Sequence, residues 1–273
     1  MNDIPAINSP PLRRRRLIAL GGLVALTVMM SPAEAQKPAG IPILAYHRFD
    51  PAIAGPTTVT RRAFTSQLAW LAQHGFRIVR LRDAVTELKA PTATAVSKEA
   101  VITVDDGHRS VYTILFPLIR KLDIPVTLFI YPSAIGRASY ALTWDQLREM
   151  QATGLVDVQS HTYWHPDFNA ERRHRKPADF QHFVDDQLRR SKAVLEAHLG
   201  KPVDMLAWPY GIVAPDLEVA ARNAGYAFAF AYEGGPAKPG ADPLALPRVP
   251  VADATRGERI VAQRIARSEG QRP

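Results

Sequence analysis

Residues 100–107 read Ala-Val-Ile-Thr-Val-Asp-Asp-Gly, an apolar run rich in β-branched residues that ends in two adjacent carboxylates. Such a run predicts a strand buried on both faces, as in a parallel sheet. Two adjacent carboxylates at the end of a buried strand repel each other unless a cation or a proton compensates their charges. On its own, Asp-Asp-Gly is more often an ordinary turn. The stretch therefore predicts a buried strand, and other motifs must decide what its carboxylates do.

Six further runs of strand-forming residues alternate with helical patterns from residue 41 onward. Helices are expected between them, for example over 62–74 and 179–199, and each of these is followed by a glycine that can end it. Residues 143–146 have the form of a capping box, which marks the start of another helix. The six runs cover residues 41–46, 77–80, 125–131, 156–160, 203–208 and 226–231.

Seven strands separated by helices predict an α/β fold, a distorted (β/α) barrel of about seven parallel strands. A barrel is favoured over an open doubly wound sheet because the polar motifs follow the carboxyl ends of strands, where barrel active sites gather. The polar segment 166–177 is expected to be a surface loop, and residues 254–267 are expected to form a final basic helix.

A second motif, His161-Thr-Tyr-Trp-His165, follows the predicted strand 156–160. Two histidines four residues apart in a helical turn can converge on one metal ion, although such a pair can also be exposed polar residues near a turn. With one aspartate they make the three-ligand set with an open position that catalytic zinc requires. The second aspartate is then free to act as a base.

Three segments carry a resemblance to a known family. In order and spacing, residues 103–107 (Thr-Val-Asp-Asp-Gly), 161–165 (His-Thr-Tyr-Trp-His) and 208–211 (Trp-Pro-Tyr-Gly) are similar to the successive motifs of the NodB-type polysaccharide deacetylases, carbohydrate esterase family four. The resemblance extends over about residues 41–250 and implies a metal-dependent hydrolase that removes acetyl groups from a polysaccharide.

The resemblance also implies a role for each matching residue. Asp106, His161 and His165 are expected to be the metal ligands, and Asp105 the general base that takes a proton from the attacking water. The backbone N–H of Tyr210 is expected to stabilise the oxyanion. The chemistry of amide hydrolysis needs each of these roles.

The proton donor departs from the family pattern. In most of the family it is a histidine in a Leu-x-His motif near the C-terminus, and no histidine follows residue 211 here. Leu44-Ala-Tyr-His47 lies on the first predicted strand, and the first and last strands of a closed barrel are neighbours. We therefore expect His47 to be the general acid, the alternative being a hydrogen-bonded histidine at a strand end. This Tyr-His signature resembles the branch that includes exported poly-β-1,6-N-acetylglucosamine deacetylases of biofilm systems.

A second departure concerns the arginine that pairs with the catalytic aspartate in the family, because Ala207 stands at its position. We expect Arg248 to reach Asp105 from a later strand and replace the missing arginine, although Arg248 could equally be an ordinary surface or sheet-edge arginine. Trp208 and Trp164 are candidates for flat apolar faces that bind sugar rings, and the alternative for both is a place in the core.

The N-terminus predicts export. Four arginines at 13–16 precede the apolar run 17–30 and a small-x-small pattern that ends at Ala35, which indicates a signal peptide over 1–35. The arginines also fit a twin-arginine signal, so either the general secretory route or the twin-arginine route could carry the chain to the periplasm or outside. We expect a catalytic domain over 36–267 and a disordered tail over 268–273. The apolar run is too short for stable membrane insertion.

The expected function is therefore an exported de-N-acetylase acting on an N-acetylglucosamine polymer, with poly-β-1,6-N-acetylglucosamine as the first substrate. Peptidoglycan or chitooligosaccharides are the alternative substrates, and a non-catalytic carbohydrate-binding protein or a hydrolase of another amide or ester are alternative functions. Zinc is the first expectation for the metal, with cobalt, nickel or iron as alternatives. The chain contains no cysteine, so a thiolate site is excluded. The formal charge of +8 suits an anionic envelope, and no motif indicates nucleic acid.

Overall fold

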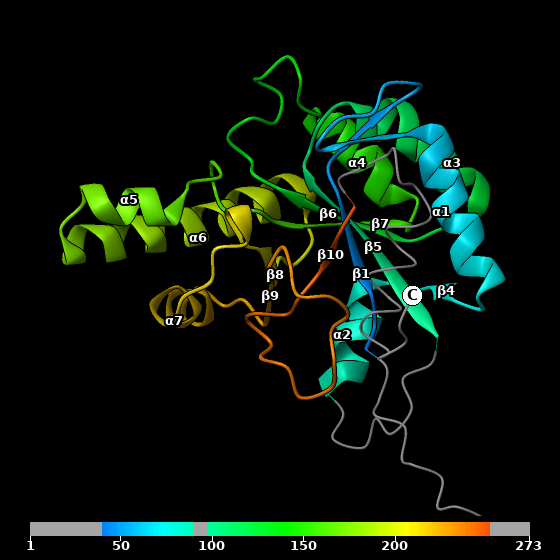
Figure 1. Ribbon diagram of the computed structural model, residues 1–273. Helices are drawn as coiled ribbons and strands as arrows, with labels where there is room; N and C mark the ends of the chain where they lie inside the picture. The colour runs from blue at the N-terminus through cyan, green and yellow to red at the C-terminus, as the bar shows by residue number, and fades with distance from the viewer. Residues whose placement is uncertain (1–39, 90–97, 252–273) are drawn as a thin grey trace, which may run out of the picture. The chain divides into compact units, whose positions relative to one another are not determined.

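The computed structural model of the chain describes residues 40–89 and 98–251 (Figure 1). The chain divides into two units, residues 1–36 and residues 37–273, and all of the described residues belong to the second unit. The expected signal peptide, the expected helix over 254–267 and the expected tail lie outside the described residues. Among the described residues, no helix is both long enough and apolar enough to cross a bilayer.

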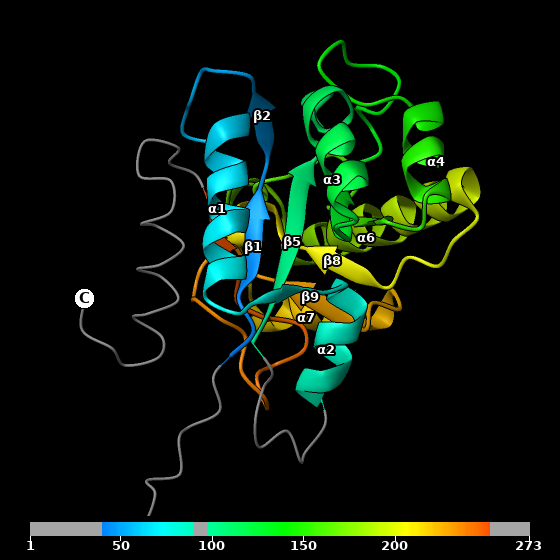
Figure 2. The same cartoon turned by 90° about the vertical axis from the view of Figure 1, so that its right-hand side faces the viewer.

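The second unit is built on a curled half-barrel sheet of seven parallel strands flanked by helices (Figures 1 and 2). The strand order is β10-β1-β5-β6-β7-β8-β9, and the short β4 (Arg77–Ile78) pairs with the beginning of β5. The seven strands are β1 (Ile43–Tyr46), β5 (Glu99–Asp106), β6 (Val126–Ile130), β7 (Val156–Ser160), β8 (Met205–Ala207), β9 (Phe228–Phe230) and β10 (Val249–Pro250). Each predicted strand run contains an observed strand, so the predicted fold class is confirmed.

Three short strands were not predicted from the sequence. β2 (Arg48–Asp50) and β3 (Thr58–Thr60) form a separate two-stranded sheet, and β10 completes the main sheet. Leu246 pairs with β9, and three residues further on Val249 pairs with β1. The segment before β10 thus bridges the two edges of the curled sheet.

The helices follow the predicted pattern closely. The capping box at Thr143 is present, and the longest helix ends at Gly200, whose φ of 64° is left-handed. The helical elements are α1 (Arg61–Gln73), α2 (Leu81–Lys89), the π-helical turn η1 (Val111–Leu115), α3 (Phe116–Leu122), α4 (Trp144–Ala152), α5 (Phe168–His174), α6 (Pro177–Leu199), the 3-10 turn η2 (Pro209–Gly211) and α7 (Pro215–Asn223).

The prediction of a surface loop over 166–177 is wrong, because α5 lies within it. Asp167 caps this helix by accepting a hydrogen bond from the backbone N–H of Ala170 at 2.9 Å. Phe168 is fully buried and packs edge-on against Phe180 and Trp208. A single apolar residue anchors the helix, so the hydrophobic periodicity that would have revealed it is missing.

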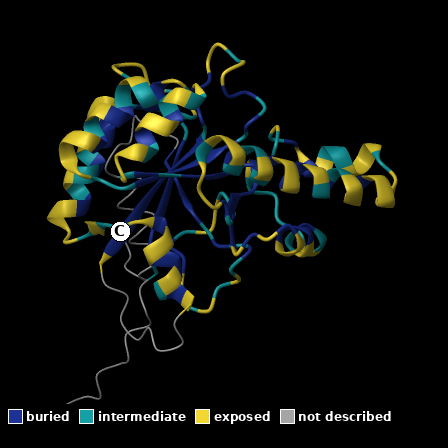
Figure 3. Cartoon of the chain, turned by 180° about the vertical axis from the view of Figure 1, so that it is seen from behind, coloured by how far each residue is buried: buried dark blue, intermediate teal, exposed yellow. Residues whose placement is uncertain are grey.

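Alternation along the strands separates two cores. On β5, Ile102 and Val104 face the helices, whereas Val101 belongs to a smaller cluster inside the curl of the sheet. α2 packs against that inner cluster through Leu81 and Val85 at the end of the sheet where the strands begin (Figure 2). The strands of the main sheet are largely buried, and the exposed residues lie on the outer faces of the helices and on the connecting loops (Figure 3). With one end covered by α2, the polar motifs occupy the other end.

Candidate active site

Asp105 and Asp106 end β5, and the backbone gives their side chains different directions. Asp105 is 1% exposed and continues the inward alternation of Val101 and Thr103. Asp106 has a φ of 74°, a left-handed conformation that costs about 1–2 kcal/mol for a residue with a Cβ. This turn breaks the alternation, so both carboxylates face the same histidine. His161 Nε2 lies 3.9 Å from Asp105 Oδ2 and 3.8 Å from Asp106 Oδ1.

His161 and His165 converge through a turn of a different kind from the helical turn that the sequence suggested. Thr162 and His165 have φ values of 63° and 66°, and the segment is not helical. The Thr162 hydroxyl accepts a hydrogen bond from the backbone N–H of His165 at 3.2 Å. The two imidazole centroids lie 4.6 Å apart. Left-handed backbone at non-glycine residues gathers at functional sites, and here it aims both rings.

The donor set of Asp106, His161 and His165 fits a divalent cation. One ligand atom from each lies within 4.8 Å of the others, and His165 Nε2 is 3.9 Å from Asp106 Oδ1. Ligands at 2.1 Å in a tetrahedral site lie about 3.4 Å apart, so the side chains need only small movements. His161 Nδ1 lies 2.7 Å from the carbonyl oxygen of Ala207, which fixes the tautomer that leaves Nε2 free as a ligand.

Burial, and then the charge of His161, lower the pKa of His165 to about 4 against the opposing charge of Asp106. A neutral imidazole is the form that coordinates a metal. Among the described residues, this triad is the group of histidines and carboxylates close enough to hold one ion. Its chemistry suits borderline cations such as zinc.

Arg248 reaches Asp105, as expected, in a bidentate pair. Its Nη1 donates to Oδ1 at 2.8 Å and its Nη2 to Oδ2 at 2.7 Å. Nε donates to the carbonyl oxygen of Ala231 at 2.9 Å, and Nη1 also donates to the Thr103 hydroxyl at 3.2 Å. Arg248 is 0% exposed, so the alternative of a surface arginine is wrong.

The pair controls the charge of the carboxyl group. Burial alone would raise the pKa of Asp105, but the charge of Arg248, then that of His161, and the hydrogen bonds from Arg248 hold it well below its usual value. Asp105 is therefore ionised and oriented, as a general base must be.

His47 follows β1 directly, one position beyond the pair of Tyr46 with Val104 of β5. Strand alternation therefore directs its side chain to the same face as Asp105. Burial lowers the pKa of His47, whereas the charges of Asp105 and Asp106 raise it. Its ring meets Tyr232 edge-on with the centroids 5.5 Å apart.

The 3-10 turn η2 brings Tyr210 to the site. Tyr210 has a φ of 56° and is 65% exposed. The centroid of its ring lies 4.7 Å from that of the His165 ring. Gly211 follows with a φ of 70°, and a Cβ there would come within 2.7 Å of the Cβ of Tyr232. Glycine therefore permits the close approach of η2 to the segment after β9, which also contacts His47.

The two tryptophans have different environments. Trp208 is 1% exposed, and its Nε1 donates to the carbonyl oxygen of Leu244 at 2.9 Å, so its interpretation as a sugar-binding face is wrong. Alternation explains this, because Ala207 belongs to the inner cluster and Trp208 must point outward to the helices. Trp164 is 42% exposed and remains available to a ligand.

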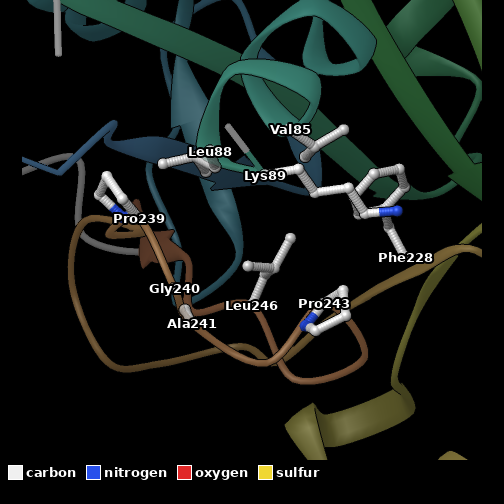
Figure 4. A pocket seen from close by; sticks show the side chains of 9 residues that line it. All are labelled: Val85, Leu88, Lys89, Phe228, Pro239, Gly240, Ala241, Pro243 and Leu246. Atoms are coloured by element: carbon white, nitrogen blue, oxygen red, sulfur yellow. The ribbon is translucent and has the colours of Figure 1, made fainter. Parts of the chain in front are cut away.

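A cavity of about 550 Å³ lies beside the triad, and His165 forms part of its wall. Tyr131, Tyr140 and Trp164 also line it. The two tyrosines were not predicted from the sequence, although Tyr131 continues the inward alternation of Thr127 and Phe129 on β6. A second, more apolar cavity of about 490 Å³ lies against α2, and none of its lining residues belongs to the triad (Figure 4).

Comparisons with known proteins agree with this geometry. Residues 92–229, half of the chain, match the sequence profile of the family described as polysaccharide deacetylase. A poly-beta-1,6-N-acetyl-D-glucosamine N-deacetylase from Staphylococcus epidermidis is 29% identical over 204 residues, which cover 72% of this chain and 68% of that protein.

Two solved structures share the fold. The structure of IcaB from Ammonifex degensii is 29% identical, with a TM-score of 0.70 over 82% of this chain and 97% of that one. The deacetylase PplD from Streptococcus pyogenes, in complex with acetate, has a TM-score of 0.71 at 21% identity and covers 84% of this chain and 99% of that one. At that identity, the second likeness supports the fold alone.

Proposed function

We propose that this chain, which belongs to the polysaccharide deacetylase family, is an exported, metal-dependent de-N-acetylase whose substrate is poly-β-1,6-N-acetylglucosamine. The observation that carries the proposal is the convergence of two carboxylates and two histidines at one end of the sheet, with one carboxylate held by a buried arginine. The substrate is suggested by relatives in Staphylococcus epidermidis and Staphylococcus aureus that are named for it, at 29% and 23% identity.

Asp106, His161 and His165 would hold the cation, with zinc as the first candidate and cobalt, nickel or iron as alternatives. A divalent cation supplies Lewis acidity, which polarises the acetyl carbonyl group and makes a water molecule more acidic. Asp105 stays outside this ligand set because Arg248 already occupies both of its oxygens. Its remaining lone pairs are available to accept a proton.

The protein's own groups then account for the hydrolysis. Asp105 accepts a proton from water as the water oxygen adds to the acetyl carbonyl carbon. The backbone N–H of Tyr210 donates to the carbonyl oxygen as that oxygen gains negative charge. The C–N bond breaks as His47 gives a proton to the nitrogen, which releases acetate and a free amine. His47 must be protonated at that step. Burial lowers its pKa overall, and the charges of Asp105 and Asp106 reduce that lowering.

The domain limits are part of the same proposal. We assign residues 1–35 to a signal peptide and 36–267 to the catalytic domain, with export to the periplasm or beyond. The basis is the arginine-rich start and the apolar run 17–30. N-terminal sequencing of the secreted protein should begin at Gln36, and a mature protein that starts elsewhere would contradict the cleavage site.

Acetate release from defined oligosaccharides tests the function. Metal-loaded protein is incubated with β-1,6-linked and β-1,4-linked N-acetylglucosamine oligomers and with peptidoglycan fragments. Mass spectrometry then counts mass losses of about 42 daltons, each of which corresponds to one acetyl group removed by hydrolysis. The proposal expects losses from the β-1,6-linked oligomers, with Asp105→Asn as the inactive control. Losses confined to β-1,4-linked oligomers or peptidoglycan would overturn the substrate. Oligosaccharide binding without acetate release would indicate a non-catalytic binding protein.

A further inference from the structure

The cavity of about 550 Å³ beside the triad has the size and surface of a sugar subsite. Ligand pockets commonly enclose about 300–1,000 Å³. Trp164 and Tyr140 are each 42% exposed and offer flat apolar faces, and the hydroxyl groups of Tyr131 and Tyr140 are hydrogen-bonded at 3.0 Å. Because His165 belongs to both the cavity and the triad, a sugar in this cavity would lie next to the one that reacts.

The charge of the cavity is one-sided. Arg137 lines it, is exposed, and forms no ion pair with a carboxylate of the described residues. None of the described residues that line the cavity is an aspartate or a glutamate. Asp106 Oδ1 lies 3.9 Å from Nε2 of the lining residue His165, so the triad supplies an opposing charge on that side of the cavity.

We propose that this cavity binds the sugar adjacent to the reacting one and that Arg137 makes it select against a neighbour that has already lost its acetyl group. The inference rests on the proposed function. Hydrolysis converts a neutral acetamide into an amine, which is protonated at pH 6.5, below the pKa of about 7.7 of a comparable α-amino group. Two like charges about 4 Å apart in water repel by ~1 kcal/mol, a factor of about five.

This selection limits the pattern of the product. Each deacetylation places a positive charge on the polymer, and that charge weakens binding when the reaction moves to the next sugar. Deacetylated residues should therefore be separated along the chain, with adjacent pairs under-represented.

Two kinds of matched substrate test the inference at pH 6.5. The first is a fully acetylated β-1,6-linked N-acetylglucosamine pentamer. The second is a set of the same pentamers, each with a single glucosamine at a different defined position. The measured quantity is the ratio of kcat/KM for the acetylated pentamer to that for the pentamer with an adjacent amine. We expect a ratio of about five or more in the unmodified enzyme on one side of the reacting sugar, and a ratio near one in Arg137→Gln. Arg137→Lys keeps the charge and should keep the ratio.

A control variant and the salt dependence test whether the charge of Arg137 causes the selection. Arg120→Gln removes an exposed arginine of α3 that does not line the cavity, and should leave the ratio unchanged. In 0.5 M NaCl the ratio should shrink, because the Debye length falls to about 4 Å. An unchanged ratio in Arg137→Gln, or a ratio near one in the unmodified enzyme, overturns the inference.

The same pair of pentamers is bound to Asp105→Asn protein with and without Arg137→Gln, so that the selection is measured without turnover. A charge-dependent difference in Kd without any acetate release from the unmodified enzyme supports the subsite and refutes the proposed reaction. Acetate release with equal Kd values for both pentamers keeps the reaction and refutes the subsite.

Discussion

Replacing Arg248 by methionine should destabilise the protein strongly because it leaves a buried carboxylate without its partner. Arg248 and Asp105 have side-chain exposures of 0% and 2%, and two hydrogen bonds of 2.7 and 2.8 Å join them. Methionine retains much of the length of the side chain and removes the charge and all of its donors.

The size of the effect follows from the burial. Breaking a buried ion pair by removing one partner costs about 3–5 kcal/mol. Domains have unfolding free energies of about 5–15 kcal/mol, so the loss is a large share of the total. The double variant Asp105→Asn/Arg248→Met removes both charges, and replacing a whole buried pair by neutral groups is often nearly neutral. The double variant should therefore be more stable than Arg248→Met alone.

Urea unfolding of the four proteins in the double-mutant cycle measures this, with chelator present so that metal binding does not contribute. We expect a coupling free energy of at least ~1.5 kcal/mol between the two positions. Arg248→Lys is the matched control, since it retains a charge but loses the bidentate geometry. If Arg248→Met loses less than ~1 kcal/mol, or if the two single effects simply add, the pair does not have the stabilising role inferred from its geometry.

Four other changes have distinct expected outcomes. Asp105→Asn should retain the metal by atomic absorption and lose most of kcat, because an amide cannot accept the proton; near-normal turnover would refute the base. His47→Asn should lower kcat by ~10² to 10⁴ with unchanged metal content, and a normal kcat would show that the acid lies elsewhere. His165→Ala or chelation should remove both metal and acetate release, and metal should restore activity only to the unmodified protein. Trp208→Phe should lower the unfolding free energy by ~1–3 kcal/mol and leave KM unchanged. A raised KM would indicate that Trp208 contributes to sugar binding after all.

Most of the fold could be predicted because the strands are buried on both faces. Runs such as residues 100–104 and 125–131 contain no charged residue and are mostly apolar, and this nearly continuous apolar pattern is typical of a parallel sheet. β10 could not be found in this way, since it has only two residues and one of them is proline. α5 was hidden for a related reason, because one buried phenylalanine gives no periodicity.

The candidate site was predictable in its residues and less so in its geometry. The resemblance to the family implied Asp106, His161 and His165 as the ligands, but the spacing of the two histidines suggested a helical turn between them. The structure has left-handed backbone at Thr162 and His165. A β-branched residue such as Thr162 rarely adopts that conformation, so its identity did not indicate the turn. Trp208 could have been excluded by counting alternate residues from Ala207, so that error came from considering the motif apart from its strand.

The two departures from the family pattern have a common explanation in the order of the strands. β10 lies beside β1, and β1 lies beside β5, although about 150 residues separate β5 from β10 in the chain. Arg248 and His47 therefore flank Asp105 from elements near opposite ends of the catalytic unit. An arginine at 207 or a histidine near the C-terminus is thus one of several ways to supply a guanidinium and an imidazole at this end of the sheet. The proposed chemistry requires a guanidinium and an imidazole beside Asp105, whichever strand carries them. A motif search that follows only the order of the chain therefore misses such residues when they come from a neighbouring strand.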